Sequence, residues 1–325
     1  MKYLARRLLR AVLLLWGVSI LCFLFTQLAP GSFFDEMRLN PQISPETITH
    51  LQERYGLDKP LLTRYARWTA SLVRGDLGYS LAYNAPVEPL LVLRAENTLL
   101  LTSVAMFLTW LIGVPLGVWT ANTRGKLFDR FIGTGNSLLI SIPEIVIAVT
   151  LLAIAVRTRA VPVGGMASLG ADELSGWAKA QDLFLHMLLP VSILVLSGVA
   201  IVERHVRTSV IEVLETPCIQ AARGLGINKT RLLFRHVLPL AANPAISLFG
   251  FSLAGLLGGS LLVEVLCGWP GLGPLILEAT LSRDLYVVIG AVMFSALFML
   301  AGNIVADLLL VACDPRIRAG EADAA

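Results

Sequence analysis

Charged residues are scarce in this sequence. Aspartate, glutamate, lysine and arginine make up 15% of it, and hydrophobic residues make up 56%. A soluble domain has about 25% charged and roughly 45–50% apolar residues. The charges are also clustered, which leaves several apolar windows of about 20 residues, a length that spans a bilayer. The composition therefore excludes an ordinary soluble domain and predicts an all-α polytopic membrane protein.

Side chains for metal binding or covalent catalysis are sparse too. The four cysteines stand far apart, at Cys22, Cys218, Cys267 and Cys313. They have neither metal-site spacing nor, on the topology below, an intrachain disulfide partner. The four histidines are divided between the two predicted sides of the membrane, His50 and His186 on one, His205 and His236 on the other. We predict no metal site and no catalytic residue.

A phosphate-binding loop is also missing. The nearest approach is residues 224–230, where Asn228 stands in place of the glycine required directly before lysine. We therefore expect no nucleotide site in this chain. The basic residues are explained by membrane topology, so nucleic-acid binding is not expected.

The apolar runs predict six transmembrane helices. The first, Ala11 to about Ala29, is longer than a signal-peptide core and follows a basic amino terminus, so we interpret it as an uncleaved span. Further spans are expected near Thr98–Ala121, Phe131–Val156, His186–Val202, Leu240–Val263 and Val287–Cys313.

Lysine and arginine in the loops predict the orientation. Residues 122–130 hold three bases against one acid, and 203–239 hold six against three. The alternate loops, 157–185 and 264–286, have no basic excess. Since basic loops stay inside, both termini are predicted to be cytoplasmic.

The outer segment between Pro30 and Glu96 is too long for a structureless connection. Ser44-Pro45-Glu46 has the pattern of a helix start, and Asp58-Lys59-Pro60 opens a second helical stretch that ends at Gly75. This helical insert is either a docking or gating cap or a packing spacer, and its composition does not decide between them.

The most informative segment, residues 217–239, is polar and basic between two hydrophobic runs. Thr216-Pro217 predicts a helix start, with the threonine hydroxyl as the cap and proline at the first helical position. Gly224 and Gly226 end that helix, and Asn228 caps a second one that runs through Arg235. We call residues 217–239 the elbow and expect it to contact a soluble partner.

Several polar residues fall inside predicted spans: Asn136, Glu144, Asn303 and Asp307. Such residues are costly in a bilayer and usually face a cavity or a partner. Asn303 and Asp307 share one helix face. For these two, helix packing is favoured over lining of a translocation path, and for Glu144 path lining is favoured.

Glycine and proline also recur inside the predicted spans, in Gly113–Gly117, Pro143, Pro190 and Gly258–Gly259. These residues allow close helix approach and kinks.

The elbow resembles the EAA loop of binding-protein-dependent ABC importer permeases. The shared pattern is Ala221-Ala222, then Gly226, then Leu238-Pro239. His236 stands where an aliphatic residue is common, as is usual in the peptide branch, and Gln220 replaces the acid. Matches continue along the chain, at Arg6–Leu9, Gly17–Ser19, Ala29–Gly31, Tyr55–Pro60, Gly75–Ser80, Asn97-Thr98, Gly113–Gly117, Ser141–Pro143, Leu189-Pro190, Glu264, Pro270–Gly273, Arg283-Asp284, Asn303, Asp307 and Asp314–Arg318.

Together these motifs resemble the first permease subunit of dipeptide, oligopeptide and nickel importers. The sequence departs from that pattern at Cys218, where an aromatic residue is usual, at Pro217, at Tyr286 and at Glu144. The resemblance implies a type I ABC importer permease fold with an extracytoplasmic helical insert after the first helix. Residues 1–96 would hold the first span and the insert, 97–313 a five-helix core with a coupling loop at 203–239, and 314–325 a cytoplasmic tail.

The resemblance also implies the partners and the sites. A second homologous permease, two cytoplasmic ATPases that bind ATP and magnesium, and an extracytoplasmic binding protein would complete the assembly in a bacterial inner membrane. The chain itself would be neither an enzyme nor the holder of a cofactor. The residues implied in ATPase coupling are Glu215, Ala221, Ala222, Arg223, Gly226, His236 and Pro239. The candidate translocation path consists of Glu144, Asn303 and Asp307.

Peptides are the expected cargo, with nickel or other small solutes as the alternative. Two other classes compete. An ion-coupled secondary transporter would need its own coupling-ion site, for which Glu144 beside Pro143 is the candidate. A non-transporting membrane scaffold would need no polar residues inside its spans. Only an ABC importer requires a separate ATPase, so a neighbouring ATPase reading frame would distinguish these classes.

Overall fold

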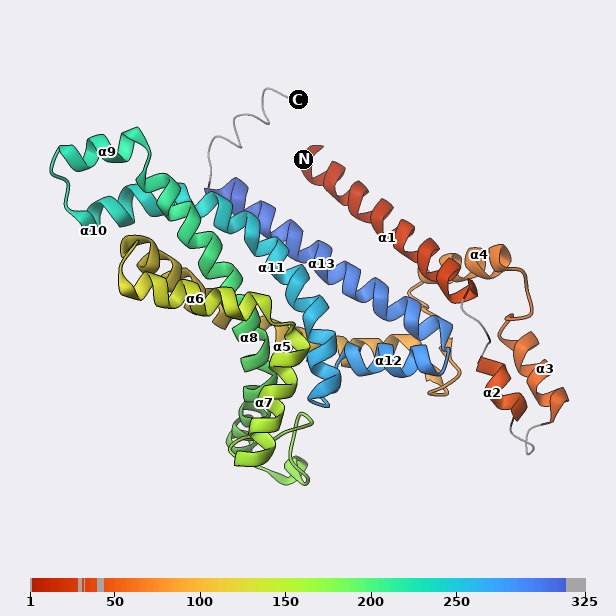
Figure 1. Cartoon of the computed structure of the whole chain (residues 1–325). Helices are drawn as coiled ribbons and strands as arrows, with labels where there is room; N and C mark the ends of the chain where they lie inside the picture. Colours follow the sequence, from red (N-terminus) through yellow and green to blue (C-terminus); the bar gives the residue numbers. More distant parts are fainter. Residues whose placement is uncertain (1, 29–30, 32, 40–43, 314–325) are drawn as a thin grey trace. The chain divides into compact units, whose positions relative to one another are not determined.

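The computed structural model describes residues 2–28, 31, 33–39 and 44–313. The predicted tail 314–325, with the Asp314–Arg318 motif, lies outside the described residues, as do Ala29 and Pro30. The described part is helical apart from one short hairpin and its loops (Figure 1). The helices are α1 (Lys2–Leu28), α2 (Phe33–Leu39), α3 (Pro45–Arg54), α4 (Leu61–Leu72), α5 (Val87–Asn122), α6 (Leu127–Ser141), α7 (Glu144–Thr158), α8 (Gly176–Leu214), α9 (Pro217–Gly224), α10 (Lys229–Leu232), α11 (Leu238–Leu266), α12 (Leu272–Leu281) and α13 (Leu285–Cys313). A 3-10 turn, η1, covers Ala171–Glu173, and a π-helical segment, η2, covers Leu233–Val237. The strands β1 (Tyr79–Ser80) and β2 (Ala85–Pro86) pair antiparallel.

Helices lie along each predicted span, and the third span is sharply bent. Within the described residues five helices are long and apolar enough to cross a membrane, and a sixth crossing is made if α6 and α7 form one span. The prediction of an all-α polytopic membrane protein is therefore confirmed. The segment that follows α1 contains α3 and α4 where two helices were expected. Ser44 caps α3 by accepting from the Thr47 amide at 3.2 Å. The short helix α2 and the hairpin were not predicted.

The predicted third span is not one helix. A break of 101° separates α6 from α7. Proline forces the residue before it out of the α region, and Ile142 accordingly has φ −87° and ψ 124°. Each half has 15 residues and is about 22 Å long, shorter than a hydrocarbon core of about 30 Å. The predicted span Phe131–Val156 thus consists of two helices with a sharp bend at Pro143, one of the prolines expected to allow a kink.

The fourth span is longer than predicted. Instead of ending at Val202, α8 continues to Leu214. Residues 203–214 of the expected coupling loop 203–239 are therefore the end of a long helix. Charge marks the edge of an apolar run, but it does not end a helix.

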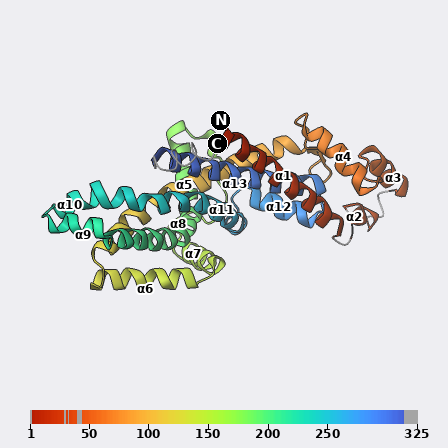
Figure 2. The same cartoon turned by 90° about the horizontal axis from the view of Figure 1, so that it is seen from above.

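The chain forms two compact units, each with its own core. Unit 1 comprises 1–98 and 270–300, and unit 2 comprises 99–269 and 301–325. In unit 1, the buried Phe23, Trp68 and Ile289 pack together. In unit 2, α6, α7 and α11 pack on α8, and both views show α9 and α10 as a bent connection between α8 and α11 (Figures 1 and 2).

Motifs far apart in the sequence meet inside unit 1. The carboxylate of Asp284, which is 3% exposed, accepts from the Ser80 hydroxyl at 2.6 Å and from the Ala82 amide at 3.1 Å. The ring of Tyr55 stacks on that of Tyr79 at 5.2 Å. These contacts bind the hairpin and the 55–60 segment to the start of α13.

A second set of contacts joins α5 to the segment before α12. The Asn97 side chain donates to the Pro270 carbonyl at 2.8 Å, and the Thr98 hydroxyl accepts from the Leu272 amide at 2.8 Å. Nearby, the Tyr83 hydroxyl donates to the Glu278 carboxylate. Partial burial and then this hydrogen bond raise the pKa of Tyr83 to about 12.

In unit 2, glycine brings α5 against α8. A Cβ on Gly117 would lie 2.8 Å from the Glu203 carbonyl oxygen, and one on Gly113 would lie 2.9 Å from the Val202 side chain. Small residues four apart allow such an approach between membrane helices. The function expected of the Gly113–Gly117 pattern, close helix packing, is present here.

Candidate functional site

The elbow begins and turns as its sequence predicts. Thr216 has the extended backbone of an N-cap, with Pro217 in the first turn of α9. Its hydroxyl, however, donates to the Val213 carbonyl at 2.7 Å and does not cap α9, so that detail of the prediction was wrong. The Asn228 side chain caps α10 by accepting from the Thr230 amide at 3.1 Å.

Gly226 closes α9 with a left-handed residue. Its φ is +76°, and the Gly226 and Ile227 amides donate to the carbonyls of Arg223 and Ala222. This pattern is the Schellman motif, in which glycine is preferred because other residues are strained at positive φ. No atom lies within 4 Å of the position of a Cβ on Gly226, so the requirement for glycine is conformational.

The second helix does not end at Arg235. After α10 the backbone continues through the π-helical segment Leu233–Val237 into α11, and the Leu238 amide donates to the Leu233 carbonyl. The predicted helix through Arg235 therefore joins the next span, and Pro239 does not interrupt it. Proline is tolerated in the first turn of a helix, and Pro239 is the second residue of α11.

One face of the elbow is buried and the other is exposed. Ile219, Leu232 and Val237 pack with Val206 and Val210 of α8. The exposed face carries two large apolar side chains, Leu225 at 84% and Phe234 at 65% exposure. It also carries four exposed bases: Arg223, Lys229, Arg231 and Arg235. This amphipathic division leaves a mixed apolar and cationic surface.

Most predicted coupling residues lie on or beside that surface. Ala221, Arg223, Gly226 and Pro239 are exposed, whereas Ala222 and His236 are half-buried. Glu215, two residues before the elbow begins, is exposed and pairs with Arg124.

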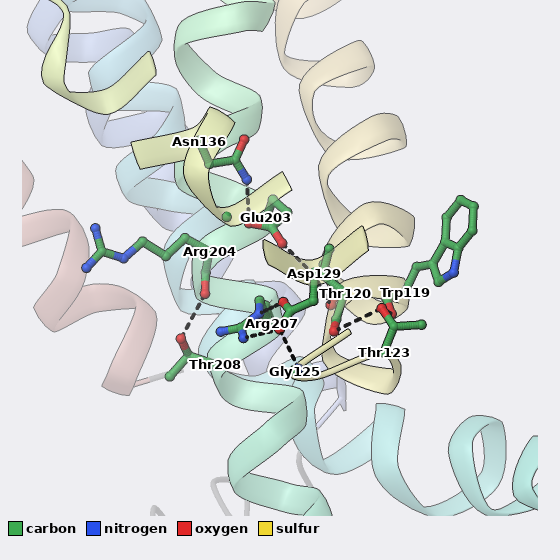
Figure 3. A network of polar contacts seen from close by, with 12 residues as sticks. Trp119, Thr120, Thr123, Gly125, Asp129, Asn136, Glu203, Arg204, Arg207 and Thr208 are labelled. Carbon is green, nitrogen blue, oxygen red and sulfur yellow. Dashed lines mark hydrogen bonds and ion pairs between the residues drawn. The ribbon is translucent and has the colours of Figure 1, made fainter. Parts of the chain in front are cut away.

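A buried carboxylate lies on α8, the helix that leads into the elbow (Figure 3). Glu203, 2% exposed, accepts from Asn136 of α6 at 2.6 Å and from the Thr120 hydroxyl of α5 at 2.5 Å. Three helices thus meet at one side chain. Asn136 was noted as a polar residue within a span, but Glu203 was counted only as a loop acid.

One turn farther along α8, an ion pair joins α8 to α6. Arg207 donates to both carboxylate oxygens of Asp129 on α6, at 2.7 and 3.0 Å (Figure 3). Asp129 also accepts from the Gly125 amide at 2.9 Å. The Asp129 side chain is 7% exposed and that of Arg207 is 30% exposed. In the sequence, Asp129 and Arg207 had been counted only as loop charges that indicate how the chain is oriented in the membrane.

The three candidate path residues lie along two helices that contact α11. The Glu144 carboxylate is 2.6 Å from the position of a Cβ on Gly259, and the Asn303 side-chain oxygen is 2.8 Å from that on Gly250. Positions 250 and 259 are about 13 Å apart along a helix. Asp307 is half-buried on α13, one turn from Asn303. The structure thus does not gather the three into one cluster.

A metal site requires several ligating side chains close together. In the described part of the chain, no three histidine, cysteine, aspartate or glutamate side chains are grouped so that they could hold an ion.

Comparison with known proteins accounts for this architecture. Residues 113–319 match the family of binding-protein-dependent transport system inner membrane components, and residues 1–89 match its N-terminal region. The chain belongs to this family. The chain is 32% identical to the oligopeptide transport system permease protein AppB of Bacillus subtilis, over 97% of the chain and 98% of AppB. It is 32% identical to OppB of Mycobacterium tuberculosis and 31% identical to the dipeptide permease DppB of Escherichia coli, in both cases over 98% of this chain and 99% of the relative.

The fold of this inner membrane component agrees with a solved relative. An inward-facing structure of the MetNI methionine ABC transporter matches with a TM-score of 0.56 and 20% identity, over 69% of this chain and 96% of the other. The chain therefore has the type I ABC importer permease fold. As a member of this family it is a multi-pass transport subunit of a membrane assembly, not an enzyme.

Proposed function

We propose that this inner membrane component moves dipeptides and oligopeptides across the bacterial inner membrane. The observation that carries the proposal is the end-to-end similarity to permeases named for oligopeptides and dipeptides. Those relatives match over nearly their whole length, so the similarity includes both compact units.

The proposed assembly contains a second homologous permease, two cytoplasmic ATPases and an extracytoplasmic binding protein, held in membrane lipid with both termini of this chain in the cytoplasm. ATP and magnesium would bind to the ATPases. The basic loops beside the spans support this orientation. In this arrangement, residues 1–96 form the first span and outer insert, and 97–313 form the transport core.

The elbow is proposed to seat in a groove of one ATPase. Its apolar side chains Leu225 and Phe234 would enter the groove, and the exposed bases would meet acidic groups at the rim. Aromatic and aliphatic anchors inside a charged rim are typical of a protein interface. Closure of the ATPases would then displace α9 and α10 and, through them, the spans.

The path proposal concerns Glu144, Asn303 and Asp307. Glu144 is the strongest candidate because it stands at the bend between α6 and α7, beside Gly259. Replacing Glu144 with glutamine should change the relative uptake of different peptides. Unchanged uptake across all of them would remove Glu144 from the path.

The deciding experiment is ATPase activity of the co-expressed complex in lipid, with binding proteins loaded with peptides or with nickel. Stimulation by a peptide-loaded binding protein is expected. Stimulation only by the nickel-loaded protein would favour metal import. Failure of any ATPase to co-purify would favour an ion-coupled transporter.

A further inference from the structure

The elbow and the end of α8 form one packed body. Ile219 of α9 and Leu232 of α10 lie in the same buried cluster as Val206 and Val210 of α8. Only two residues separate the last residue of α8 from the first of α9. A displacement of the elbow must therefore move the last turns of α8.

The same turns of α8 hold α6. Glu203 and Arg207 are four apart on one face of α8, and their partners Asn136 and Asp129 lie two turns apart on one face of α6 (Figure 3). The pairing order shows that the two helices run antiparallel. We call Thr120, Asp129, Asn136, Glu203 and Arg207 the polar ladder.

The ladder is a firm attachment because its two carboxylates are buried, Glu203 at 2% exposure and the Asp129 side chain at 7%. Breaking one partner of a buried charge pair leaves the other charge unsatisfied in a poorly solvated place. The approach of α5 at Gly117 adds backbone contact beside Glu203. Sliding α6 along α8 would require the Asn136–Glu203 hydrogen bond and the Arg207–Asp129 ion pair to break together.

The far end of α6 is the break at Ile142 and Pro143. Beyond it, α7 turns away by 101° and begins with Glu144. The proline leaves the backbone without a helical hydrogen bond at this point, so it is the place in the α6–α7 pair where an angle can change most easily.

We propose that the polar ladder makes α6 move as one body with α8 and the elbow, so that displacement of the elbow changes the angle at the 142–143 break. Glu203, Asp129 and Arg207 are positioning residues: they act through α6 and need no contact with cargo. This inference rests on the proposed ATP-driven import.

Spin labels test the motion directly in the assembled complex. One pair of labels replaces the exposed Leu138 on α6 and Ile201 on α8, and a second pair replaces Leu138 and Ile154 on α7, with Cys218 changed to serine. The distance across the ladder should stay constant between the nucleotide-free and ATP-trapped states, while the distance across the break changes. A change across the ladder, or no change across the break, would overturn the proposal.

Charge reversal tests whether the ladder couples hydrolysis to transport. Asp129→Arg and Arg207→Asp each place like charges together and should lower peptide import per ATP hydrolysed by about tenfold, the usual scale of coupling between sites. The double variant restores opposite charges and should recover most of that loss. Glu203→Leu should uncouple similarly, whereas Glu212→Leu, at an exposed position of α8, should not.

The outcomes separate this inference from the proposed function. If the unmodified complex does not import peptide, the proposed function fails. If it does, but the single variants keep a normal ratio of import to hydrolysis or the double variant does not recover, the ladder inference alone fails.

Discussion

The residues that carry the family resemblance are used differently in two regions of the molecule. In unit 1 they contact one another: Ser80 and Asp284 are buried together, and Thr98 binds the backbone at Leu272. In the elbow, by contrast, Ala221, Arg223 and other motif residues face outward. Contacts within the fold explain why the motif residues of unit 1 are present. The motif residues that face outward on the elbow are not buried in such contacts, and their presence is explained if a partner covers them.

This contrast can be tested by separating stability from transport. Substitutions in unit 1 should reduce stability and thereby reduce transport. Substitutions on the exposed elbow should reduce transport with little loss of stability.

The largest loss of stability is expected for Asp284→Ala. It removes the acceptor for Ser80 and Ala82, together with the cap at the start of α13, and should destabilise unit 1 by about 2–4 kcal/mol. Hydrogen exchange of the amides in 79–86 should rise sharply. The exposed Asp58→Ala is the matched control, and equal protection in the two variants would show that the buried contacts do not stabilise the hairpin.

Gly117→Ala should have the next largest effect. Its Cβ would meet the Glu203 carbonyl oxygen at 2.8 Å and should cost about 1–3 kcal/mol by forcing α5 from α8. Gly133→Ala, where no atom lies within 4 Å, should instead be neutral or slightly stabilising. Thermal unfolding midpoints of the purified complexes compare the two, and shifts of the same sign would contradict the close approach.

Gly226→Val sharpens the contrast at the elbow. A branched residue at φ +76° should strain the turn by about 1–2 kcal/mol, leave membrane insertion intact and abolish uptake. Gly224→Val is the control, since Gly224 also has open space but no positive φ. Uptake assays on both variants decide, and normal uptake with Gly226→Val would count against the coupling role.

The smallest effect is expected for Arg124→Gln. The Arg124 and Glu215 side chains are 57% and 62% exposed, so their pair should contribute about 0.2–1 kcal/mol and less at high salt. Thermal unfolding at low and high ionic strength measures this. A loss as large as that of Asp284→Ala would erase the distinction between buried and exposed contacts.

Local patterns predicted local structure well. Ser44, Pro217 and Asn228 start helices as expected, because a cap depends on a few neighbouring residues. The spans were found for a similar reason, since apolar length is a property of one segment. Their ends were less accurate, as the continuation of α8 to Leu214 shows.

Contacts between distant segments could not be predicted in this way. Glu203 and Arg207 were counted as loop charges, yet they lie in a helix and bind Asn136 and Asp129. Nothing in a single sequence pairs residues separated by 67 or 78 positions. The bend at Pro143 had a visible signal, but whether a proline kinks a span or breaks it depends on the helices packed around it.

The π-helical segment Leu233–Val237 determines what a one-codon deletion in the gene would do to the elbow. A π turn holds about one residue more than an α turn, and each residue of an α-helix turns the chain by about 100°. Deleting one codon in this segment would therefore convert the π turn into an α turn and leave the facing of the elbow relative to α11 nearly unchanged. A one-residue gap here would present the same face of the elbow to a partner, whereas a one-residue deletion in the regular helix α11 would rotate the elbow by about 100°.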